Sequence, residues 1–181
     1  GLDIGSESII EVGACKVSKT GKETFFQEMV KPTKEISPLI TKITGITNEM
    51  VAHAPPLKPV LSALVDFCGD AHWVAHNAQF DVPWLLLSLM RHNLPLRAGK
   101  VLCTLKWAKE KENGRRSLGV LSKKYNIGHE NAHRALADAV VTKSLYYIYQ
   151  QESDEVPLEE IDRYVAISKK TMAQNADFVQ A

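Results

Sequence analysis

Two short segments each combine a carboxylate with turn residues that could place it at the start of a helix. In His76-Asn77-Ala78-Gln79-Phe80-Asp81, Asn77 is suited to precede a helix whose first turn carries Asp81. A helix N-terminus stabilises an ionised carboxylate, and ligand sites in α/β proteins form where strands end. Asp81 is therefore a candidate ligand for a hard divalent cation, which prefers oxygen donors. On spacing alone, an aspartate that only stabilises the helix is the simpler interpretation.

The second segment, His133-Arg134-Ala135-Leu136-Ala137-Asp138, places a histidine five residues before a carboxylate. Positions five apart do not share a face of a regular helix, because their offset is about 140°. They converge if His133 lies on the loop before the helix and Asp138 lies in its early turns. Asp138 would then be a second metal ligand, and His133 could take a proton from a nearby water. A capping histidine with a solvent-facing aspartate is the alternative. Small residues here would let the helix approach a sheet closely: Ala132, Ala135, Ala137 and Ala139.

Strands and helices must position these side chains. Hydrophobic patterns and turn residues predict strands at 9–17, 23–30, 72–76 and 101–104, and helices at 38–44, 57–67, 78–92, 105–111, 117–125 and 134–150. A final amphipathic helix is expected after Pro157, up to about Lys170. This order predicts an α/β fold with a mixed β-sheet flanked by helices. We expect one domain over residues 1–150, followed by a C-terminal helix and tail over residues 151–181.

Composition is that of a soluble globular protein, with 45% hydrophobic and 24% charged residues in a chain of 181. No apolar run approaches the roughly 18 residues that would indicate a membrane span, and no signal peptide is visible. Cys15, Cys68 and Cys103 are odd in number and far apart, so we expect buried thiols in a reducing compartment. A cytoplasmic location is therefore expected.

Charge is unevenly distributed although the formal net charge is only +1. Residues 97–124 contain nine basic and two acidic residues, a local net charge of +7, whereas residues 152–162 contain six acids and no cation. The basic segment could follow a phosphate backbone. A solvated helix surface explains it equally well.

Taken together and in this order, the two carboxylate segments resemble the second and third motifs of the DnaQ-like (DEDDh) 3′–5′ exonuclease family. Further stretches fit the same family: Ile9–Ala14, Ile43–Met50, Val101–Leu105 and Ser117-Leu118. The chain is similar in particular to the proofreading exonucleases of bacterial DNA polymerase III, of the epsilon-subunit or PolC type. The resemblance implies a ribonuclease H-like fold and hydrolysis at single-stranded DNA 3′ ends with two divalent cations, Mg²⁺ or Mn²⁺. It also implies a polymerase catalytic subunit as a possible partner.

The resemblance assigns roles residue by residue. Asp81 and Asp138 match the family's third and fourth acidic residues, and His133 matches the histidine that distinguishes this subgroup. Leu2 matches a residue that contacts the terminal nucleotide. The stretches that line the substrate site contain four further nucleic-acid-binding candidates: Thr44, His76, Asn77 and Ser117.

The family's first motif is Asp-x-Glu followed closely by Thr-Thr-Gly-Leu, and Gly1-Leu2 match only its last two residues. Asp3, Glu7 and Glu11 do not have the spacing or strand position to replace the missing pair. We therefore expect the chain as written to be nearly inactive, and we expect metal-dependent digestion of single-stranded DNA when the upstream residues are restored.

Three other functions compete with DNA proofreading. His129-Glu130-Asn131-Ala132-His133 has the H-E-x-x-H spacing of zinc peptidases. That site needs both histidines on one face of a continuous helix, and Gly128 directly before it is typical of a helix stop. A 3′–5′ exoribonuclease of the same superfamily is the nearest alternative, because discrimination depends on contacts at the 2′ position. A non-catalytic polymerase-binding module is the third, with Val156–Lys170 as the docking segment. Coverage of the domain's own core is the favoured role of that segment.

Overall fold

The computed structural model of the chain describes residues 9–97 and 99–179, with side chains described up to Thr171. The strands are β1 (Glu11–Val17), β2 (Glu23–Met29), β3 (Trp73–Ala75), β4 (Lys100–Cys103) and β5 (Glu159–Glu160). The helices are α1 (Pro38–Thr44), α2 (Asn48–Val51), α3 (Leu57–Cys68), α4 (Ala78–Arg91), α5 (Thr104–Lys111), α6 (Leu118–Lys124), α7 (Ala135–Gln151) and α8 (Asp162–Val179).

The described strands form two small sheets. β1 and β2 are an antiparallel hairpin in which Glu11 lies opposite Met29. β3 pairs with β4 in parallel and β4 pairs with β5 antiparallel, so this sheet is mixed. The mixed α/β fold predicted from the sequence is thus confirmed, although the strands divide into two sheets here. Helix α7 packs against β1, β2 and β3, so one helix spans both sheets.

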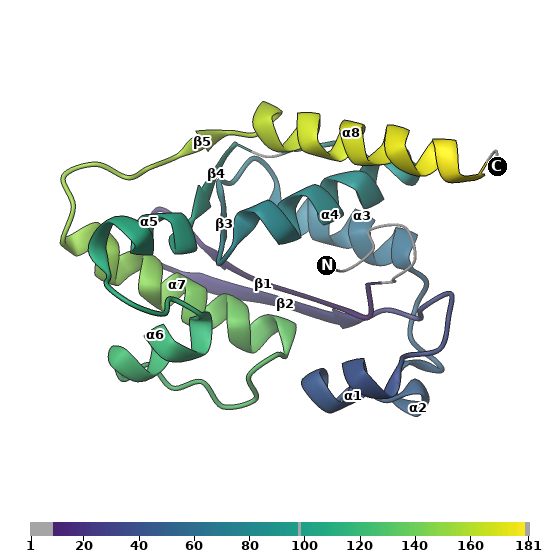
Figure 1. Cartoon of the computed structure of the whole chain (residues 1–181), viewed down its shortest axis with the longest axis horizontal. Coiled ribbons are helices and arrows are strands. Elements are labelled where there is room, and N and C mark those ends of the chain that lie inside the picture. Colours follow the sequence, from purple (N-terminus) through teal and green to yellow (C-terminus); the bar gives the residue numbers. More distant parts are fainter. Residues whose placement is uncertain (1–8, 98, 180–181) are drawn as a thin grey trace.

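β4 separates two buried layers because successive side chains of a strand point to opposite faces. Val101 and Cys103 pack with α4 and with Tyr164 of α8, whereas Leu102 packs with residues of α5, α6 and α7. In Figure 1, α4 lies to the right of β3 with α8 above it, whereas α5 lies to the left of β3 and α6 and α7 lie lower in the view. The two carboxylate-bearing helices, α4 and α7, therefore cover opposite faces of the sheet.

Helix α8 covers the core through α4. Tyr164 and Ser168 are fully buried, and the Ser168 hydroxyl lies 3.1 Å from the Pro83 carbonyl oxygen. Tyr164 donates its hydroxyl to Glu159 at 2.6 Å, which ties α8 to β5. The segment after Pro157 thus covers the domain's own core, as the sequence favoured. Among the helices described, none is long and apolar enough to cross a membrane.

The acidic segment at 152–162 partly neutralises the basic segment at 97–124. Glu160 pairs with Lys100 at 2.8 Å, Glu159 pairs with Lys106, and Lys111 donates to the Glu152 carbonyl at 2.8 Å. Four cations of the basic segment have no partner within the part of the chain that the structure describes: Arg97, Lys109, Arg115 and Lys123. These four side chains can contact phosphate without competition from an internal partner.

Candidate active site

Both carboxylates lie in the first turn of a helix, and each helix follows a residue with left-handed backbone geometry. Asp81 lies in α4 after Asn77, whose φ is 71°. Asp138 lies in α7 shortly after His133, whose φ is 68°. Non-glycine residues with positive φ are uncommon and gather at functional sites. Asn77 directly precedes α4, as its sequence position indicates, but its side chain makes no capping bond. Its left-handed backbone makes the turn, and its carbonyl accepts from Phe80 N at 2.8 Å.

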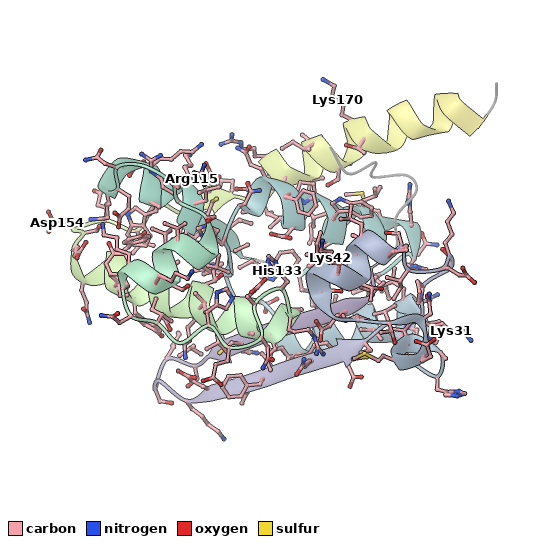
Figure 2. All side chains as sticks on the ribbon, turned by 60° about the horizontal axis from the view of Figure 1, so that its bottom comes forward. Lys31, Lys42, Arg115, His133, Asp154 and Lys170 are labelled. Carbon is pink, nitrogen blue, oxygen red and sulfur yellow. The ribbon has the colours of Figure 1, made fainter. Side chains whose placement is uncertain are left out.

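Asp138 is held by the loop that precedes α7. Its Oδ1 accepts from the backbone N–H of His133 at 3.2 Å and lies 2.7 Å from His129 Nε2. His133 therefore lies on the loop before the helix and Asp138 lies in its first turn, which is the arrangement their spacing required. The backbone N–H of His133, and not its imidazole, makes the hydrogen bond to Asp138. The exposed side chain of His133 has no hydrogen-bond partner among the described residues. Figure 2 labels His133 near the centre of the view, and both figures place the start of α7 beside α1.

Asp81 lies close enough to Asp138 for their charges to interact. Asp81 is an exposed residue, but neighbouring protein atoms partly desolvate its carboxyl, and this desolvation raises the pKa to about 6. The negative charge of Asp138 raises it further, while a backbone hydrogen bond opposes the change. The structure thus brings Asp81 and Asp138 into one site from two different helices.

His76 joins the same region but uses both ring nitrogens within the protein. Nε2 lies 2.9 Å from the Arg116 carbonyl and Nδ1 lies 3.0 Å from the Thr104 hydroxyl. Burial lowers the pKa of His76, and the Arg116 carbonyl and the charge of Asp138 offset this only in part. A neutral ring that donates from Nε2 must accept at Nδ1. His76 therefore fastens the α5–α6 loop to the end of β3, and its predicted contact with nucleic acid remains a prediction.

The other nucleic-acid candidates differ in how free their polar groups are. The Thr44 hydroxyl donates to the Ile40 carbonyl at 2.9 Å and accepts from Ile46 N at 3.2 Å, so it closes the end of α1. Asn77 and Ser117 are exposed, and neither side chain makes a capping bond. Ser117 follows Arg116, whose carbonyl His76 contacts. Leu2 lies outside the described residues.

Two residues near the site escaped the sequence analysis. His129 contacts Asp138, and Glu11 of β1 binds the residues that begin α7. His129 was visible only as part of the H-E-x-x-H string. The structure excludes the helical zinc site, because residues 129–133 form a loop with turns in which Asn131 has a φ of 60°. Glu11 was set aside because its spacing does not fit the first motif, and only the fold reveals its partner.

The carboxylate pair suits a hard divalent cation. The charge of Asp138 disfavours ionisation of Asp81, and a cation between the two carboxylates would relieve this repulsion. Carboxylate oxygens are the donors that Mg²⁺ and Mn²⁺ prefer. Within residues 9–97 and 99–179, no group of three or more His, Cys, Asp or Glu side chains is arranged to hold a metal ion. A cation between Asp81 and Asp138 would therefore need further ligands.

Comparison with known proteins gives consistent matches. The family model described as exonuclease (RNase_T) matches residues 1–146. DNA polymerase III PolC-type from Streptococcus pyogenes serotype M18 (strain MGAS8232) is 36% identical over 157 residues, which are 86% of this chain. The same protein from Streptococcus sanguinis (strain SK36) is 37% identical over 157 residues. This chain spans only 11% of the length of either relative.

Solved structures agree on the fold. Exonuclease X in complex with 5′ overhanging duplex DNA has a TM-score of 0.63 and 28% identity, covering 84% of this chain and 88% of that one. The nuclease domain of 3′hExo, a DEDDh family member bound to rAMP, has a TM-score of 0.64 at 15% identity, covering 84% of this chain and 97% of that one. The ribonuclease H-like fold and the resemblance to the DnaQ-like (DEDDh) exonucleases are confirmed, and the chain belongs to the exonuclease family.

Proposed function

We propose that this chain is a 3′–5′ exonuclease unit that hydrolyses phosphodiester bonds at the 3′ end of single-stranded DNA with Mg²⁺ or Mn²⁺. The observation that carries the proposal is the pair Asp81 and Asp138, presented by the first turns of α4 and α7 and close enough for one charge to raise the pKa of the other. The motif order of the family, in which these positions are acidic, supports the same role.

The chain's residues divide the chemistry between them. Asp81 and Asp138 hold the cations, and His133 accepts a proton from the attacking water at an imidazole nitrogen. Bound cations would activate that water and stabilise charge on the attacking and leaving oxygens. The free side chains of Asn77 and Ser117 bind the substrate beside them. The family's first motif adds two carboxylates, and Gly1-Leu2 match its last two residues.

Proofreading of DNA synthesis in the cytoplasm is the cellular role we propose. Its support is the 36% identity to DNA polymerase III PolC-type, of whose length the matched residues are 11%, together with the exonuclease model that matches residues 1–146 of this chain. The partner would then be a polymerase catalytic subunit or region, and the substrate would be the frayed 3′ end of the growing strand.

A single-stranded DNA labelled at its 5′ end tests the reaction. The chain, joined at Gly1 to an Asp-x-Glu-Thr-Thr segment that completes the first motif, should shorten this DNA stepwise from its 3′ end when Mg²⁺ or Mn²⁺ is present. Asp81→Asn and Asp138→Asn should abolish shortening, and His133→Gln should slow it by about 100-fold or more. Immediate release of the labelled nucleotide, or no metal-dependent digestion at all, would overturn the proposal.

Asp154→Asn is the matched control. Asp154 is exposed and Figure 2 shows it at the edge of the molecule, away from His133, so its loss should leave the rate unchanged. An RNA of the same sequence provides the second comparison. Faster shortening of RNA than of DNA would replace the DNA assignment with the exoribonuclease alternative.

A further inference from the structure

The buried carboxylate of Glu11 binds the residues at the start of α7. The Glu11 side chain is 4% exposed and accepts from Arg134 Nη2 at 2.7 Å and from the backbone N–H of Ala135 at 2.8 Å. Gln27 of the neighbouring strand donates to it at 2.9 Å. Burial by itself raises the pKa of Glu11, but the hydrogen bonds from Arg134, Ala135 and Gln27 outweigh it, so the pKa is lowered. The ionised form of Glu11 is thus favoured, and it binds both the residue before α7 and the first residue of α7.

The backbones at this point are in direct contact. A Cβ on Gly13 would lie 2.3 Å from Leu136 N and 2.5 Å from the Ala135 carbonyl carbon. At Gly13 no side chain therefore separates β1 from the start of α7. Ala135 begins the helix whose first turn carries Asp138. A shift at Ala135 must move Asp138, because a helical turn transmits it rigidly.

We propose that Glu11 is a positioning residue that fixes the start of α7 and thereby holds Asp138 where it can share a divalent cation with Asp81. Glu11 does not touch the cation or the substrate in this account, and acts through Arg134 and Ala135. The inference rests on the proposed function, since it assigns a purpose to the Asp81–Asp138 pair.

The same interface contains a matched control. Lys143 of α7 binds Glu23 of β2 at 2.7 Å, so a second ion pair joins the same helix to the same hairpin. Lys143 lies about two turns beyond Ala135, and the Glu23 side chain is 37% exposed. Its loss should loosen the α7–hairpin interface without moving the start of α7.

Binding of Mn²⁺ to the chain, followed through paramagnetic broadening of the amide signals in the first turns of α4 and α7, tests the inference without catalysis. Glu11→Gln should weaken Mn²⁺ binding by about tenfold, the effect usual for residues that orient metal ligands. Glu23→Gln should bind Mn²⁺ as the unchanged chain does. Thermal unfolding of each variant reports the stability lost. Arg134→Lys, which keeps the charge but loses the two-point contact, serves if Glu11→Gln does not fold.

The outcomes separate the two proposals. Unchanged Mn²⁺ affinity in Glu11→Gln and Arg134→Lys, or equal weakening in Glu11→Gln and Glu23→Gln, overturns the positioning role and leaves the exonuclease proposal intact. Broadening that survives Asp81→Asn shows that Mn²⁺ binds elsewhere, and this overturns both.

Discussion

Around the two carboxylates, some polar atoms make hydrogen bonds within the protein, and others are available to bind a ligand. His76 uses both ring nitrogens internally, and Asp138 uses Oδ1 to bind His129 and the backbone of His133. Within the described residues, Asp138 Oδ2 has no hydrogen-bond partner. Asp138 is therefore oriented through one oxygen and can offer the other to a cation.

Asp81 should make stability depend on pH. Its pKa is raised from 3.8 to about 6, so the folded state holds the proton more tightly than the unfolded state. The free energy of unfolding should therefore fall as pH rises across this window and level off above it. Asp81→Asn has no such proton, so its stability relative to the unchanged chain should rise between pH 4 and pH 6. Urea unfolding of both proteins at several pH values measures this difference. A difference independent of pH would contradict the assigned desolvation and charge repulsion.

The sequence singled out Asp81 and Asp138 as candidates through the order of the family's motifs, because the spacing of each segment alone favoured a structural role. It could not reveal the contact between Glu11 and the start of α7, because Glu11 and Arg134 lie 123 positions apart in the sequence. The contact of His129 with Asp138 could not be predicted either. It depends on a loop with left-handed residues, which no periodic pattern describes.

At the scale of elements, most helices were predictable, including the short helices α1, α5 and α6, whereas the end of α8 and the briefest elements were not. α3, α4 and α7 end within two residues of their predicted bounds, since each buries an apolar stripe of helical spacing. α2 has four residues and β5 has two. Segments this short show no hydrophobic periodicity in the sequence, and tertiary contacts define them. The division of the strands into two sheets was likewise not predictable from alternation alone.

Gly13, like Glu11, lies where β1 meets the start of α7. Alanine in a strand ordinarily stabilises relative to glycine, but here its Cβ would collide with the backbone of α7. Gly13→Ala should therefore destabilise the fold by about 1–3 kcal/mol, as measured by chemical denaturation. Gly119→Ala is the control, because nothing lies within 4 Å of its Cβ position in α6. It should stabilise by about 0.5–1 kcal/mol. The same sign for both variants would refute the close approach.

At the scale of the whole molecule, α8 belongs to the core that supports Asp81. Tyr164 packs against Ala78, Val82 and Leu86 of α4, and β5 pairs with β4 beside them. The C-terminal segment therefore stabilises the helix that presents Asp81.

Tyr164→Ala should remove about 3 kcal/mol or more of unfolding free energy, because a fully buried ring leaves a cavity. Tyr147→Ala, at a side chain 39% exposed on α7, should cost less than about 1 kcal/mol. Urea denaturation compares the two. Equal small losses would show that α8 does not support the core.

The shared cation site is tested most directly by a crystal structure grown with Mn²⁺ and a nucleoside 5′-monophosphate, using the anomalous signal of manganese. The account predicts a manganese peak at about 2.0–2.2 Å from carboxylate oxygens of both Asp81 and Asp138. A peak bound elsewhere, or no peak between these two carboxylates at saturating Mn²⁺, would contradict it.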